Sequence, residues 1–112
     1  DVWKRSHLVA LNIYKITKDF PREEIFGMVS QLRRSASSVT ANIAEGFGRF
    51  HFKDKIKFYY QARGSLLEVQ SFLLLSRDLD FISNNKFQEL SKDIEVATKL
   101  LNGLIRSVGK IV

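Results

Sequence analysis

Apolar residues recur along this chain at intervals of three and four, the spacing that places side chains on one face of an α-helix. No segment alternates apolar and polar residues as a half-buried strand does. Breaks fall near Phe20-Pro21, near Gly46-Phe47-Gly48 and at Ser83-Asn84-Asn85, where proline, glycine or asparagine favours leaving a helix. The pattern therefore predicts four helices joined by short connections.

The first helix is expected at about residues 4–18, the second from Arg22 to the glycine break, the third at 52–78 and the fourth from the asparagine break through Val108. Their apolar stripes are Val9, Ile13 and Ile16; Ile25, Met28, Leu32, Ala36, Val39 and Ile43; Phe52, Ile56, Tyr59, Leu66 and Leu73; and Phe87, Leu90, Ile94, Ala97, Leu101, Leu104 and Val108. Such stripes are buried when the helices pack antiparallel around one core. We expect an all-α, up-and-down antiparallel four-helix bundle, with residues 1–112 forming a single domain.

Two helices carry a second surface that predicts self-association. On a helical wheel, a group of small residues lies nearly opposite the Leu32 stripe and consists of Ser37, Ala41, Ala44 and Gly48. On the third helix, a second apolar line lies well apart from the Tyr59 stripe and consists of Phe58, Ala62, Val69 and Phe72. Wide apolar coverage of a surface helix is typical of an interface between copies of a chain. The alternative for the second helix is that an exposed face simply tolerates alanine and serine.

Polar side chains also occur where the third helix should be apolar. Arg63 falls within its main stripe, and an unpaired buried guanidinium costs several kcal/mol. Asn42 and Glu45 flank the stripe of the second helix, and Glu68 is a further possible partner, so we expect a structural polar network of these four residues. The alternative is that Arg63 extends its guanidinium to solvent over a packed stem.

Composition narrows the class of protein. The 112 residues include no cysteine, which excludes disulfides and thiolate metal sites, and no apolar run approaches the roughly 20 residues of a membrane-spanning helix. The N-terminus lacks the pattern of a signal peptide. We expect a soluble, cytoplasmic protein.

A search for catalytic or metal-binding chemistry finds none in the sequence. No glutamate is followed three residues later by histidine, as in di-iron bundles, and His7 and His51 belong to no ligand-spaced cluster. Phosphate-binding loops, dinucleotide fingerprints and nucleophile elbows are absent as well. We therefore expect a protein that is not an enzyme and that has no metal, cofactor or small-molecule substrate.

The net charge of +6 is concentrated in one part of the chain. Between Arg33 and Arg63, seven lysines and arginines stand against two acids. Six of these cations are expected to contact the phosphates of RNA or DNA: Arg33, Arg34, Arg49, Lys53, Lys55 and Lys57. An exposed Phe50 would stack on a base. The alternative is that the lysines are only the solvated face of the third helix.

Segments 20–27, 31–36, 38–46 and 60–68, together with Val2-Trp3, resemble the bacterial four-helix bundle family encoded by intervening sequences in large-subunit rRNA genes. The resemblance implies an up-and-down bundle and, in some members, a homopentamer. The family also includes the accessory variability protein of diversity-generating retroelements, which works with a reverse transcriptase and nucleic acid. It supplies no catalytic residues. Whether its counterparts here are structural or functional stays open for Arg33, Arg34, Asn42, Glu45, Gly46, Arg63 and Glu68.

Charge and resemblance together favour a non-enzymatic, oligomeric module that binds RNA or DNA. The alternative is a scaffold that recruits a partner protein, with the basic surface serving only docking or solubility. The salt dependence of nucleic-acid binding separates the two, since phosphate contacts weaken steeply as salt rises.

Overall fold

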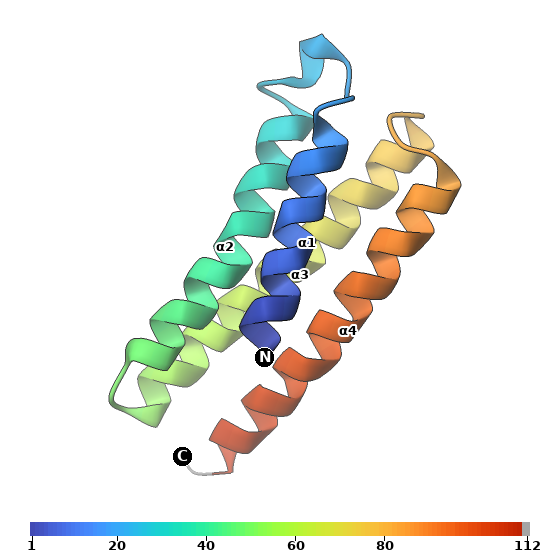
Figure 1. Cartoon of the computed structure of the whole chain (residues 1–112). Coiled ribbons are helices and arrows are strands. Elements are labelled where there is room, and N and C mark those ends of the chain that lie inside the picture. The colour runs from blue at the N-terminus through green and yellow to red at the C-terminus, as the bar shows by residue number, and fades with distance from the viewer. Residues whose placement is uncertain (111–112) are drawn as a thin grey trace.

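The computed structural model describes residues 1–110, which form four long helices and one short 3-10 turn. The helices are α1 (Val2–Thr17), α2 (Met28–Gly48), α3 (Phe52–Asp78) and α4 (Asn84–Gly109), and the 3-10 turn η1 spans Arg22–Glu24. Consecutive helices run in opposite directions along a bundle about 45 Å long (Figure 1). The expected all-α, up-and-down four-helix bundle is confirmed.

Each helix packs on its neighbours in the chain, and α1 and α4 close the ring. The predicted stripes meet inside it, where Ile13, Leu32, Leu66 and Leu101 are all buried. Burial of a side chain of this size contributes about 1.5–3 kcal/mol, so the core is the main source of stability. Phe52 departs from the prediction because it begins α3 at the open end of the bundle and is exposed.

The second helix begins later than expected. Arg22–Glu24 form the separate turn η1, and α2 starts only at Met28, after Gly27 leaves the helical region with φ −106° and ψ −110°. Ile25, expected in the core stripe, is half-exposed because it lies in this connection. The other end of α2 extends through Gly48, so the predicted glycine break falls inside the helix.

The α3–α4 turn is built by local backbone geometry. Asp80 has a φ of 62°, in the left-handed region, and the N–H of Phe81 donates to the Ser76 carbonyl at 2.8 Å. Ser83 then caps α4, because its hydroxyl accepts the Lys86 N–H at 3.1 Å. The Phe81 ring lies 5.5 Å from that of Phe20, so the two turns at this end contact each other.

The second apolar line of α3 lies largely inside the subunit, which corrects the interface prediction. Ala62 and Val69 are fully buried, and Phe58 and Phe72 are partly buried. The reason is that α3 packs against both α2 and α4 and needs two apolar faces within one chain. Val69 is thereby excluded from a surface between subunits, whereas Ala41 and Ala44 are exposed on α2.

A different line on α3 is the one left uncovered. Tyr60, Leu67 and Leu74 are spaced by seven residues and are 47%, 64% and 42% exposed.

Among the described residues, no helix has both the length and the apolar character to cross a membrane.

Candidate nucleic-acid interface

Four of the six predicted phosphate contacts gather where α2 turns into α3. We call this region, Arg49–Lys57, the α2–α3 tip. Phe50 is 89% exposed, with its ring edge-on to His51 at 5.2 Å. Lys53 and Lys57 are exposed, and neither makes an ion pair within residues 1–110. The tip therefore exposes the Phe50 ring and two ammonium groups within the same short segment of the chain.

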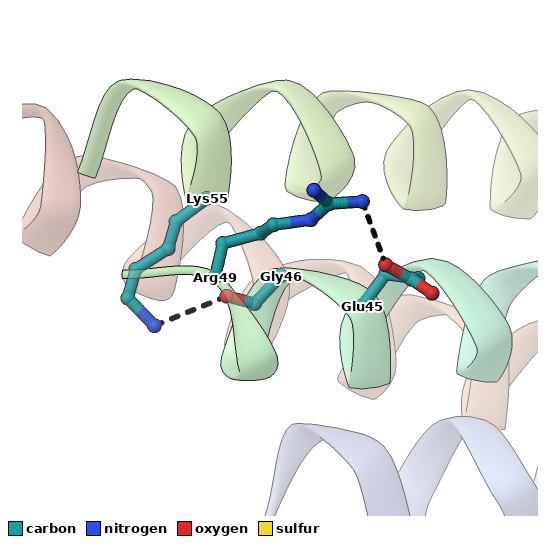
Figure 2. Close-up of polar contacts among 4 residues, drawn as sticks. All are labelled: Glu45, Gly46, Arg49 and Lys55. Atoms are coloured by element: carbon teal, nitrogen blue, oxygen red, sulfur yellow. Dashed lines mark hydrogen bonds and ion pairs between the residues drawn. The ribbon is translucent and has the colours of Figure 1, made fainter. Parts of the chain in front are cut away.

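The other two cations of the tip have partners within the chain (Figure 2). Arg49 pairs with Glu45 at 3.1 Å, and its guanidinium lies 4.8 Å from the centre of the Phe58 ring. The Lys55 Nζ donates to the carbonyls of Gly46 at 3.0 Å and Phe47 at 3.1 Å. These carbonyls lie in the last turn of α2, where no further backbone N–H of the helix is available to donate to them. A positive charge is also favourable at this end of a helix dipole. Lys55 thus holds the turn, a role that the charge pattern alone did not indicate.

A close contact between α2 and α3 fixes the tip. A Cβ at Gly46 would lie 2.9 Å from Cδ1 of Tyr59, so only glycine fits. Tyr59 is buried, and desolvation raises its pKa above 10.0. The Phe47 ring lies edge-on to that of Tyr59 at 6.0 Å. The base of the tip is therefore a tightly packed joint.

Arg33 and Arg34 do not belong to this cluster. At 1.5 Å per residue, about 24 Å of helix axis separates position 33 from position 49. Arg33 Nε donates to Thr17 Oγ1 at 2.9 Å, one of its terminal nitrogens donates to the Tyr14 carbonyl at 3.3 Å, and its guanidinium lies 4.7 Å from the centre of the Tyr14 ring. Arg34 is exposed. The single patch expected from sequence is therefore two separate groups of cations.

The expected polar network around Arg63 is wrong in its partners. Arg63 donates to Asn102 Oδ1 of α4 at 3.1 Å and lies 5.0 Å from the centre of the Tyr60 ring. Its hydrogen bond goes to α4, and neither Asn42 nor Glu45 of α2 bonds to it. Asn42 instead donates to the carbonyl and hydroxyl of Ser38.

The remaining member of that network, Glu68, is exposed and makes no ion pair in the part of the chain that the structure describes. Gln70, another polar residue in the α3 stripe, donates to Ser91 Oγ of α4 at 3.1 Å. Asn102 was missed because it follows Leu101 on the margin of an otherwise regular stripe. Its only signal was an amide next to the core of α4.

Within residues 1–110, no group of three or more histidine, cysteine or acidic side chains is placed to hold a metal ion. His7 stacks on Trp3 with ring centres 4.8 Å apart, and His51 is at the tip. Both histidines therefore have aromatic neighbours.

Comparison with known proteins identifies a family and solved structures of similar fold. The model of the 23S rRNA-intervening sequence protein family matches residues 1–103. A crystal structure of a protein of unknown function from the S23 ribosomal protein family of Bacteroides thetaiotaomicron VPI-5482 is similar, with 26% identity and a TM-score of 0.84, and covers 94% of this chain and 98% of that one. No functionally curated protein matches.

Proposed function

The chain belongs to the family of 23S rRNA-intervening sequence proteins, and from this premise we propose that it is a non-enzymatic module that binds nucleic acid through the α2–α3 tip. The observation that carries the proposal is that the tip exposes Phe50 together with Lys53 and Lys57, which make no ion pair within residues 1–110. Ammonium groups neutralise phosphates, and an uncovered phenyl ring offers a stacking surface to an unpaired base. RNA is the preferred ligand because the family name refers to rRNA, and DNA is the other outcome of the test.

The four cations of the tip have different roles in the proposed binding. Lys53 and Lys57 are four residues apart and share one side of α3, so both can reach one backbone. The Arg49–Glu45 pair is exposed, with about half of each side chain accessible. Such surface pairs contribute about 0–1 kcal/mol, so Arg49 can exchange its carboxylate for a phosphate at little cost. Lys55 stays on the carbonyls of α2.

The experiment is a salt titration of binding to labelled single-stranded RNA and DNA of one sequence, followed by fluorescence anisotropy. Lys53→Ala with Lys57→Ala should reduce the slope of log affinity against log salt by about 1.4, or about 0.7 per lost phosphate contact. Phe50→Ala should weaken binding by about 1–3 kcal/mol with little change in slope.

The matched control is Lys4→Ala with Lys92→Ala, which removes the same charge from exposed positions of α1 and α4 that make no ion pair within the described residues. Equal slopes for the two double variants would contradict a site at the tip, because only the total charge would then matter. Absence of salt-dependent binding to either nucleic acid would reject the proposal.

The exposed line of Tyr60, Leu67 and Leu74 favours a second candidate, a scaffold that self-associates or recruits a partner protein. Beside this line, a groove runs between α3 and α4, and it is lined by Leu66 and Leu67 of α3 and by Ile94 of α4. Self-association, including a pentamer, stays a proposal. Light scattering of the wild type should give a multimer and Leu67→Glu should give a smaller species, whereas a monomeric wild type at high concentration would remove this form of the scaffold.

A further inference from the structure

A hollow of about 730 Å³ lies between α1, the first turns of α2 and the connection that joins them. We call it the α1–α2 hollow. Within residues 1–110, four cations line it, Lys18, Arg22, Arg33 and Arg34, and no carboxylate does. We propose that the α1–α2 hollow binds a nucleotide unit, with the phosphate on these cations and the base on the exposed ring of Phe26. This inference concerns the opposite end of the bundle from the tip and does not depend on the proposed function.

The positive charge of the hollow, carried by these four cations, has no ion-pair partner in the part of the chain that the structure describes. Asp19, Glu23 and Glu24 belong to the same connection but do not line the hollow. The Glu24 carboxylate instead accepts the Met28 N–H at 3.1 Å, at the start of α2. An anion entering the hollow therefore meets cations that have no competing carboxylate.

Arg33 is held in place before any ligand arrives. Its two hydrogen bonds, to Thr17 Oγ1 and the Tyr14 carbonyl, use two of the five N–H donors of a guanidinium. The other three have no protein partner in residues 1–110. A fixed guanidinium loses little conformational freedom when it binds a phosphate, which favours affinity. Arg22 and Arg34, both exposed, complete the charge around it.

Phe26 argues for a ligand that is planar as well as anionic. Its side chain is 96% exposed, so it contributes almost nothing to the core, yet it lines the hollow beside the cations. Tyr14 also lines the hollow but already has the Arg33 guanidinium over its ring. Phe26 is thus the free stacking surface.

The dimensions of the hollow agree with such a ligand. Its volume lies within the range of about 300–1,000 Å³ that small-molecule sites occupy. Phosphate and base can come from two sources, a free mononucleotide or one nucleotide of a single strand. Both offer the same chemistry to the hollow, and the probes below distinguish them.

The test is calorimetric titration of the whole chain with four probes: inorganic phosphate, adenosine, adenosine 5′-monophosphate and a short single-stranded RNA. The monophosphate should bind at least about tenfold more tightly than phosphate or adenosine, because only it engages both cations and ring. Arg34→Ala and Phe26→Ala should each weaken it about tenfold. Thermal melts should be unchanged for both variants, since neither side chain is buried.

The control is Lys4→Ala with Lys92→Ala, at exposed positions outside both the hollow and the tip, which should leave binding of the monophosphate unchanged. Binding of RNA but not of the monophosphate, lost on Arg34→Ala and Phe26→Ala, assigns the hollow to a strand. The proposal is overturned if neither the monophosphate nor the RNA binds, or if Arg34→Ala and Phe26→Ala leave the binding of both unchanged. Loss of RNA binding on changing Phe50 or Lys53 alone bears only on the tip.

Discussion

The two ends of the bundle present positive charge in different ways. At the α2–α3 tip only three residues separate the helices. Of its four cations, Lys55 bonds to backbone carbonyls of α2 and Arg49 pairs with Glu45. At the α1–α2 hollow a ten-residue connection joins the helices, and four cations from several segments surround one concave surface. The contrast shows that a run of basic residues does not measure free charge. What matters is how many of those side chains the backbone itself requires.

The largest effect should come from disturbing the joint beneath the tip. Gly46→Ala places a methyl group against the Tyr59 ring, so the free energy of unfolding should fall by about 2 kcal/mol. Chemical denaturation measures it. Gly64→Ala is the matched control, because nothing lies within 4 Å of a Cβ there and α3 should gain up to about 1 kcal/mol. Equal effects of the two changes would mean that the tip is loosely packed.

Next in size is the difference between the two adjacent arginines of the hollow. Arg33→Ala removes two hydrogen bonds that join α1 to α2 and should destabilise the protein by about 1.5–2 kcal/mol. Arg34→Ala should change stability by less than about 0.5 kcal/mol. Thermal unfolding of both variants measures the difference, and a silent Arg33→Ala would show that the hollow is not preorganised.

A smaller difference is expected between two lysines of the tip. Lys55→Met keeps the aliphatic stem but loses both donors to the end of α2, so we expect a cost of about 1 kcal/mol. Lys53→Met should have no measurable effect on stability but should weaken nucleic-acid binding. The reverse ranking in unfolding experiments would place Lys55, not Lys53, among the free cations.

The smallest effect concerns pH. Because burial raises the pKa of Tyr59 in the folded state, the unfolded chain releases this proton first as pH rises. Stability should therefore be unaffected by Tyr59 below pH 10.0 and should fall above it. Urea midpoints between neutral pH and pH 11 measure the fall, and Tyr59→Phe should lessen it. Tyr60→Phe, at an exposed position, is the control and should not.

The sequence was sufficient to predict the helices and their buried faces, but not which side chains of neighbouring helices contact each other. The spacing of Leu32, Ala36, Val39 and Ile43 predicts a buried face because it is a property of one helix, and all four are buried. The pairing of Arg63 with Asn102 depends on how α3 and α4 are rotated against each other, which no local pattern encodes. Val69 was misplaced for the same reason.

The hollow illustrates this limit most clearly. Lys18 and Arg22 lie in the connection, outside the basic run between positions 33 and 63, so a count along the chain separates them from Arg34. The fold brings them together because α1 and α2 are antiparallel neighbours (Figure 1). Phe26 was assigned no role because the connection was expected to be helical.

The joint between Gly46, Tyr59 and Lys55 also constrains how this surface can diverge among homologues. Exchange of lysine for arginine at positions 53 and 57 keeps the charge and disturbs no contact, so such substitutions should not lower the stability of the fold. Position 55 needs a compact ammonium that fits two neighbouring carbonyls, and position 46 accepts no side chain. Relatives should therefore vary in which cations they display while keeping the glycine and the lysine that make the display possible.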